Sequence, residues 1–235
     1  KGGDIFDVVM AITGETEITR AVWSIKNRAV RAGLEYGQVE QQKPRQVHDF
    51  TAQLEGAGAP MRAIEPGGYT YVVDGYGLRQ TPEGDVLVPH RRDGVTYAVK
   101  VRYRSGGKGA WAGSVPTAHL YAPSGAIDPN PELVAVLCEG ESDCWAMADA
   151  LRRSGQRAQV LGLPSGAAAW KDHWLDELRV YRKVYVCMDN DRAGRQAADK
   201  IVRKIGWAKA TELKVPQLRS DVREAVETGW IPDLP

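Results

Sequence analysis

Carboxylate side chains are grouped at three places in the second half of the sequence. Each group directly follows an apolar segment or lies a few residues beyond one: Glu139, Glu141 and Asp143; Asp189 and Asp191; and Asp221. Negative charges held close together repel one another unless a cation lies among them. Oxygen ligands without His or Cys favour Mg²⁺ or Mn²⁺ over zinc. Such an ion suits phosphoryl or nucleotidyl transfer, or phosphodiester cleavage.

The segments around these acids alternate between strand-like and helix-like patterns. We predict four strands and three helices: strands at 133–138, 158–162, 183–188 and 210–215, and helices at 142–154, around 170–178 and at 193–205. This order indicates the α/β fold class, with a mostly parallel sheet and helices on both faces. Ligands of such sheets bind beyond the carboxyl ends of the strands, so we expect the acids to face one site.

Each acid taken alone has a second interpretation as a helix cap, because Asp and Glu are common at the start of helices. Capping does not require two successive strand ends to carry groups of acids. The segments 139–143 and 189–195 therefore favour a metal site.

These two segments, Glu-Gly-Glu-Ser-Asp at 139–143 and Asp-Asn-Asp-Arg-Ala-Gly-Arg at 189–195, resemble the two motifs of the TOPRIM domain. That domain occurs in bacterial (DnaG-type) primases, topoisomerases, recombination-repair proteins and some nucleases. The resemblance implies that Glu139, Asp189 and Asp191 are catalytic and organise Mg²⁺ or Mn²⁺.

The same resemblance implies further site residues. Arg-Ser-Asp at 219–221 stands where primases of the family carry a Lys-Asp motif, which implies Asp221 as a metal ligand. Leu-Pro-Ser-Gly at 163–166 resembles the family's loop after the second strand, close to the site. Arg192 and Arg195 would assist at the metal edge. Secondary site residues would be Glu141, Asp143, Ser165 and Gly166.

A basic, strand-rich region precedes the acids. We predict strands at 69–73, 86–89 and 95–104, with Asp-Gly at 93–94 as a hairpin turn. Residues 79–108 carry seven Lys or Arg and three Asp or Glu, whereas the whole chain has a formal net charge of +1. We expect one strand face to carry three cations and the following loop a fourth, all binding template phosphates or a nucleoside triphosphate: Lys100, Arg102, Arg104 and Lys108. The alternative is an ordinary solvated strand face.

The first half resembles the amino-terminal part of a primase catalytic core, most of all the primase part of phage T7-type primase–helicases. We predict a helical segment at 1–36, a connecting segment at 37–68, a small α+β subdomain at 69–130 and a TOPRIM domain at 131–235. The chain begins at Lys1 without a Met, so we expect a longer protein that also has a zinc module and a helicase.

Composition excludes several other classes of protein. With 43% hydrophobic and 26% charged residues, the chain is of ordinary globular composition. Three Cys without metal-ligand spacing predict neither a disulfide framework nor zinc in this part of the protein. The apolar runs are too short to span a bilayer, so we expect a cytoplasmic protein with no membrane partner.

The leading hypothesis is the catalytic core of a DNA-dependent RNA primase. It would synthesise short RNA primers on single-stranded DNA from ribonucleoside triphosphates, by Mg²⁺-dependent nucleotidyl transfer, with a fused or associated replicative helicase. One alternative is a TOPRIM nuclease, which uses similar acids with water as the nucleophile. The other is a non-catalytic nucleic-acid-binding module.

Overall fold

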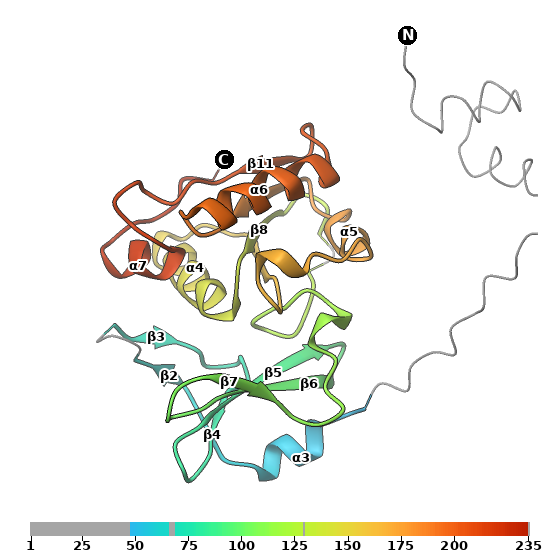
Figure 1. Cartoon of the computed structure of the whole chain (residues 1–235), viewed down its shortest axis with the longest axis vertical. Coiled ribbons are helices and arrows are strands. Elements are labelled where there is room, and N and C mark those ends of the chain that lie inside the picture. Colours follow the sequence, from blue (N-terminus) through green and yellow to red (C-terminus); the bar gives the residue numbers. More distant parts are fainter. Residues whose placement is uncertain (1–47, 66–68, 129, 235) are drawn as a thin grey trace, which may run out of the picture. The chain divides into compact units, whose positions relative to one another are not determined.

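The computed structural model of this protein describes residues 48–65, 69–128 and 130–234. These form a five-stranded antiparallel sheet, a two-stranded antiparallel sheet and a four-stranded parallel sheet with its helices (Figure 1). The helices predicted within residues 1–36 lie outside the described residues, as do residues 37–47 and 66–68 of the connecting segment that follows. The described part of that segment, residues 48–65, contains a short helix and two short strands. The division of the chain between residues 130 and 131 stays a prediction.

The five-stranded sheet has the order β1-β4-β5-β6-β7. Its strands are β1 (Ala59–Pro60), β4 (Arg79–Gln80), β5 (Val86–Arg92), β6 (Val95–Arg102) and β7 (Lys108–Ala110), and β2 (Ala63–Ile64) pairs with β3 (Tyr71–Val72) nearby in sequence. The predicted Asp-Gly turn joins β5 to β6. Asp93 and Gly94 both have positive φ, 51° and 83°, as a two-residue turn of type I′ requires.

The two faces of this sheet have different partners, because side chains alternate along a strand. Leu87, Val99 and Val101 pack with Leu54 of the short helix α3 (Thr51–Gly56). The opposite face carries Val88, His90, Lys100 and Arg102, since Val88 pairs with Lys100 across the ladder. An irregularity in the β5–β6 pairing follows His90, the kind of feature that redirects a side chain.

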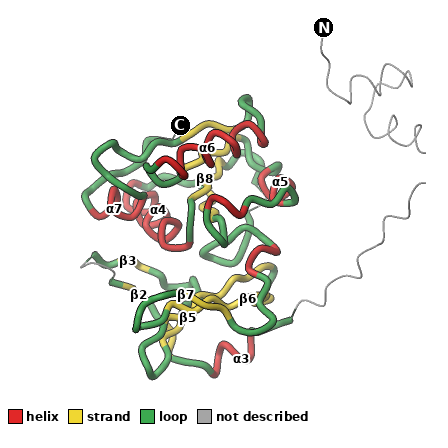
Figure 2. Tube along the Cα trace, viewed as in Figure 1, coloured by secondary structure: helices red, strands yellow, loops and turns green. Residues whose placement is uncertain are grey.

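The parallel sheet has the order β11-β10-β8-β9 and is built as the sequence predicts. Its strands are β8 (Val134–Cys138), β9 (Gln159–Gly162), β10 (Lys183–Cys187) and β11 (Ala210–Glu212). Four α-helices accompany it: α4 (Glu141–Ser154), α5 (Trp174–Leu178), α6 (Arg192–Ile205) and α7 (Val222–Glu227). Figure 2 shows these helices in red around β8. Two short 3₁₀ turns, η2 (Pro116–Ala118) and η3 (Ala167–Ala169), lie in connections between the elements.

All five residues of β8 are buried, because both faces of the sheet are covered. Val136 and its alternate neighbours share a core with Trp145 of α4 and Val222 of α7. Leu137 on the other face shares a core with Trp174 of α5 and Ile201 of α6. This arrangement places the carboxyl ends of β8 and β10 side by side, with Cys138 opposite Cys187 in register.

Four predicted elements are shorter than expected by two or more residues. The strand predicted at 69–73 is β3, which contains only Tyr71 and Val72. The last residue of β11, Glu212, pairs with Val186 of β10. β11 ends there because β10 itself ends one residue later, at Cys187. α5 begins only at Trp174, after a turn in which the Asp172 carboxylate accepts hydrogen bonds from Trp170 and from Lys204. β6 ends at Arg102. Within the part of the chain that the structure describes, no helix has the length and apolar character needed to cross a membrane.

Candidate active site

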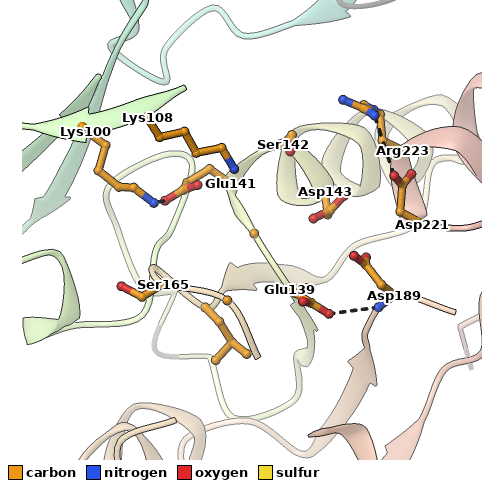
Figure 3. A pocket seen from close by; sticks show the side chains of 14 residues that line it. Lys100, Lys108, Glu139, Glu141, Ser142, Asp143, Ser165, Asp189, Asp221 and Arg223 are labelled. Atoms are coloured by element: carbon orange, nitrogen blue, oxygen red, sulfur yellow. Dashed lines mark hydrogen bonds and ion pairs between the residues drawn. The ribbon is translucent and has the colours of Figure 1, made fainter. Parts of the chain in front are cut away.

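A cavity of about 580 Å³ lies at the carboxyl ends of β8 and β10. It unites acids of the parallel-sheet region with lysines of the antiparallel sheet (Figure 3). Its lining consists of Lys100, Lys108, Gly109, Glu139, Gly140, Glu141, Ser142, Asp143, Leu163, Ser165, Gly166, Asp189, Asp221 and Arg223. Seven residues that the sequence predicts for the metal site or its surroundings therefore meet here: Glu139, Glu141, Asp143, Ser165, Gly166, Asp189 and Asp221.

Glu139 and Asp189 face each other because they follow neighbouring parallel strands. The backbone N–H of Asp189 donates to Oε2 of Glu139 at 3.2 Å. Oδ1 of Asp189 is buried and has no hydrogen-bond partner among the described residues. A buried carboxylate oxygen without a donor is normally costly, and a cation is one group that satisfies it.

Two of the cavity acids have strongly raised pKa values. Burial, together with the charges of Asp189 and Asp221, raises the pKa of Asp143 to about 7. Burial, followed by the charges of Glu139 and Asp221, likewise raises the pKa of Asp189 to about 7. Carboxylates that shift one another in this way form one electrostatic cluster, which a divalent cation would relieve.

The donor set fits Mg²⁺ in its chemistry, although no three His, Cys, Asp or Glu side chains of the described residues are arranged to hold an ion by themselves. Mg²⁺ prefers oxygen ligands, and proteins commonly hold it with one or two carboxylates while water and substrate phosphates supply the rest. Glu139 and Asp189, with the unpartnered Oδ1, offer that kind of ligand pair.

The helix-cap interpretation applies to two of the predicted ligands. Asp221 precedes α7, and its Oδ1 accepts from the backbone N–H of Glu224 at 2.7 Å. Its Oδ2 lies 3.7 Å from Nη2 of Arg223, and the residue lines the cavity. Asp191 precedes α6 and accepts from the backbone N–H of Gly194 at 2.7 Å. Asp191 is exposed and does not line the cavity.

Glu141 is occupied by partners from the antiparallel sheet. Its Oε1 accepts a hydrogen bond from Nζ of Lys100 at 2.5 Å and lies 3.2 Å from Nε2 of His90. Its Oε2 lies 3.7 Å from the guanidinium of Arg102. Burial alone would raise the pKa of Glu141, but His90 and Lys100 lower it to about 2. Burial lowers the pKa of His90, so a neutral ring donates from Nε2 to the carboxylate.

These contacts join β5 and β6 to the first turn of α4, with Lys100 also donating to the carbonyl oxygen of Pro164 at 2.8 Å. Glu141 and Lys100 therefore neutralise each other at one side of the cavity. The guanidinium of Arg102 lies over the ring of Trp145, 4.8 Å from its centre. Lys108 reaches the cavity from β7 and is exposed.

Four predicted basic residues do not line this cavity: Arg102, Arg104, Arg192 and Arg195. The expectation that Arg104 shares a strand face with Lys100 is wrong, because β6 ends two residues before it. The backbone N–H of Arg104, in the turn after β6, instead donates to Oδ1 of Asp85, just before β5, at 2.9 Å. Arg192 is exposed at the start of α6, and Arg195 donates to the backbone carbonyl of Asn190 at 2.7 Å.

Sequence reasoning missed two residues of this region. Arg223 lines the cavity and lowers the pKa values of Asp143 and Asp189. The helix dipole disfavours a cation in the first turn of a helix, so Arg223 at the start of α7 indicates that neighbouring carboxylates balance its charge. His90 had no such signal in its spacing.

The comparisons with known proteins agree with this architecture. Residues 136–225 match the family model described as Toprim-like. This part of the chain is an α/β domain of the Toprim fold, preceded by an antiparallel sheet region like the primase subdomain. A search of curated proteins found no match.

Two solved structures share the fold of this chain. The first is the primase fragment of the bacteriophage T7 primase-helicase protein, with a TM-score of 0.58 and 16% identity, over 74% of this chain and 76% of that one. The second is a chain from the structure of bacteriophage T7 lagging-strand DNA polymerase interacting with primase domains of two gp4 subunits. Those domains are bound to an RNA/DNA hybrid and dTTP. This second match has a TM-score of 0.52 at 18% identity, over 66% of this chain and 82% of that one.

Proposed function

We propose that this chain is the catalytic core of a DNA-dependent RNA primase, which makes short RNA primers on single-stranded DNA. The observation that carries the proposal is one cavity in which acids at the ends of β8 and β10 face Lys108 of the antiparallel sheet. The fold shared with the T7 primase fragment supports the same assignment.

On this proposal Glu139 and Asp189 would be the ligand pair for Mg²⁺. Asp221 would join them when the ion is bound, and Asp191 would contribute from the start of α6. When bound there, the ion would supply Lewis-acid chemistry that helps to position a nucleoside triphosphate and to activate the attacking 3′ oxygen. Lys108 binds phosphate groups, because it is exposed and faces the acids across the cavity. Lys100 holds Glu141 and thereby the antiparallel sheet against α4.

The remaining predicted residues belong to the edges of the site. Ser165 and Gly166 line the cavity together with Lys100 and are proposed to contact the nucleotide. Arg102, Arg104 and Arg192 are proposed to contact the template phosphates.

The proposed partners are single-stranded DNA, ribonucleoside triphosphates and a replicative helicase. One similar structure is part of a primase-helicase, and the other contains primase domains bound to an RNA/DNA hybrid. We therefore propose that the chain works within a longer replication protein with a zinc module, in the cytoplasm of a bacterial or phage-infected cell.

The test is a primer-synthesis assay on single-stranded DNA with labelled ribonucleotides, with and without Mg²⁺ and with a control that lacks nucleotides. We expect short RNA only with the metal, and none from Asp189→Ala or Glu139→Gln. The matched control is Asp199→Ala, which removes an exposed acid of α6 that pairs with Arg203. Metal-dependent degradation of DNA without nucleotides would identify a nuclease instead. DNA binding with no metal-dependent reaction would identify a binding module.

A further inference from the structure

Asn190 lies between the two acids of the segment after β10 and contacts the segment that carries Asp221. Its backbone N–H donates to the carbonyl oxygen of Ser220 at 2.7 Å. Its side-chain Nδ2 donates to the carbonyl oxygens of Arg219 at 3.2 Å and Gln217 at 3.4 Å. Among the described residues, every hydrogen bond between residues 189–191 and 216–221 is made by Asn190.

The amide of Asn190 is fixed in one orientation. Nη1 of Arg195 donates to Oδ1 at 3.2 Å and to the backbone carbonyl oxygen of Asn190 at 2.7 Å. The side chain must therefore accept on one side and donate on the other. An amide does both, whereas an ionised Asp has no donor for the facing carbonyl groups.

The two segments that Asn190 joins carry charges that repel. Asp189 and Asp221 both line the cavity, and carboxylates held close together repel each other unless a cation lies among them. Without a cation, this repulsion pushes the segments apart. The hydrogen bonds of Asn190 oppose that movement and do not occupy an oxygen of either acid.

We propose that Asn190 is a positioning residue, which holds Asp221 beside Asp189 so that both carboxylates can serve one divalent cation. Arg195 acts through Asn190 by fixing its amide. The inference rests on the metal site of the proposed function and names residues that set its geometry.

The first experiment measures binding of Mn²⁺ alone to the full chain, from the electron paramagnetic resonance signal of free Mn²⁺. Loss of a group that orients metal ligands typically weakens metal affinity by about 10- to 100-fold. We expect a weakening of that order from Asn190→Ala and from Asn190→Asp. Asn130→Ala, in an exposed turn, is the matched control and should bind as the unmodified chain does. Urea unfolding in EDTA establishes that each variant is folded.

A second experiment separates positioning from general stability. If Asn190 acts through Asp221, Asn190→Ala should weaken Mn²⁺ binding much less in an Asp221→Asn background, because coupled residues are not additive. Should Asn190→Ala prevent folding, Arg195→Ala tests the same amide: we expect weaker Mn²⁺ binding, with recovery in Arg195→Lys, which keeps a donor.

Each outcome bears on one proposal. Unchanged Mn²⁺ affinity in both Asn190→Ala and Arg195→Ala, or full additivity with Asp221→Asn, would overturn the role of Asn190. If Asp221→Asn and Asp189→Asn leave Mn²⁺ affinity unchanged, the metal site itself is wrong and the proposed function fails with it.

Discussion

Glu141→Gln should destabilise the protein strongly, although Glu141 follows the same strand as the proposed metal ligand Glu139. The carboxylate is 4% exposed and is shared by His90, Lys100 and Arg102. The substitution keeps the shape of the side chain but removes its charge. Two partly buried cations from β6, Lys100 and Arg102, then lack a counter-charge.

The size of the effect follows from the pKa of Glu141, which falls from 4.5 to about 2 in the folded protein. A shift of that size corresponds to about 3 kcal/mol in favour of the ionised form. Removing one partner of a buried ion pair has a similar effect, about 3–5 kcal/mol. We therefore expect Glu141→Gln to lower the free energy of unfolding by about 3 kcal/mol, or Tm by about 6–12 °C for a chain of this size.

The assay is urea unfolding at pH 7 in EDTA, followed by far-ultraviolet circular dichroism, so that metal binding does not contribute. Glu132→Gln, at an exposed position, is the control and should be neutral. Lys100→Met in combination with Glu141→Gln should be less destabilising than the sum of the single changes, because the pair is lost together. A loss below about 1 kcal/mol for Glu141→Gln, or strict additivity with Lys100→Met, would refute the assignment of Glu141 as the buried link between the sheets.

Three further predictions concern the cavity. Gly194→Ala should lower stability by about 1–3 kcal/mol and weaken Mn²⁺ binding, because the added methyl group would overlap the backbone carbonyl oxygen of Asp189. Gly56→Ala is the control, because Gly56 has open space around it, and equal stability losses in the two variants would contradict this packing. Asp189→Asn should raise stability at pH 8 in EDTA by about 1 kcal/mol, since it removes a negative charge that the neighbouring acids repel and that water partly screens. The same substitution should abolish stabilisation by Mg²⁺, and an unfolding curve that still responds to Mg²⁺ would argue against Asp189 as a ligand. Lys108→Ala should reduce the salt dependence of single-stranded DNA binding by about 0.7 in logarithmic slope for each phosphate that Lys108 neutralises, and an unchanged slope measured by fluorescence anisotropy would exclude its binding to the DNA backbone.

The parallel-sheet region was largely predictable from the sequence. Buried strands with apolar side chains on both faces, separated by amphipathic helices, have one common arrangement, and chain order then places residues 139 and 189 at the same edge. Element lengths were less predictable. The end of β11 depends on where its neighbour β10 stops, and the end of β6 depends on the turn between residues 102 and 108.

The contacts around the acids could not be predicted in the same way. The ion pair of Lys100 with Glu141 joins residues 41 positions apart, and His90 reaches the same carboxylate across 51 positions. Such pairs depend on how two sheets pack and on which rotamers fit between them, and no local spacing records either. The same holds for Asn190, whose neighbours in sequence suggest a metal motif but whose hydrogen bonds go to the segment before α7.

The amino-acid sequence by itself determined the α/β order, the grouping of carboxylates and the chemistry they suit, because these depend on residue type and on periods of two and 3.6 residues. Only the tertiary structure decided which charges are already neutralised and which remain available. Lys100 is paired while Lys108 faces the acids, and Arg223 lies among them although it was not expected. The physical reason is that burial and neighbouring charge act through space, and segments distant in the chain supply both.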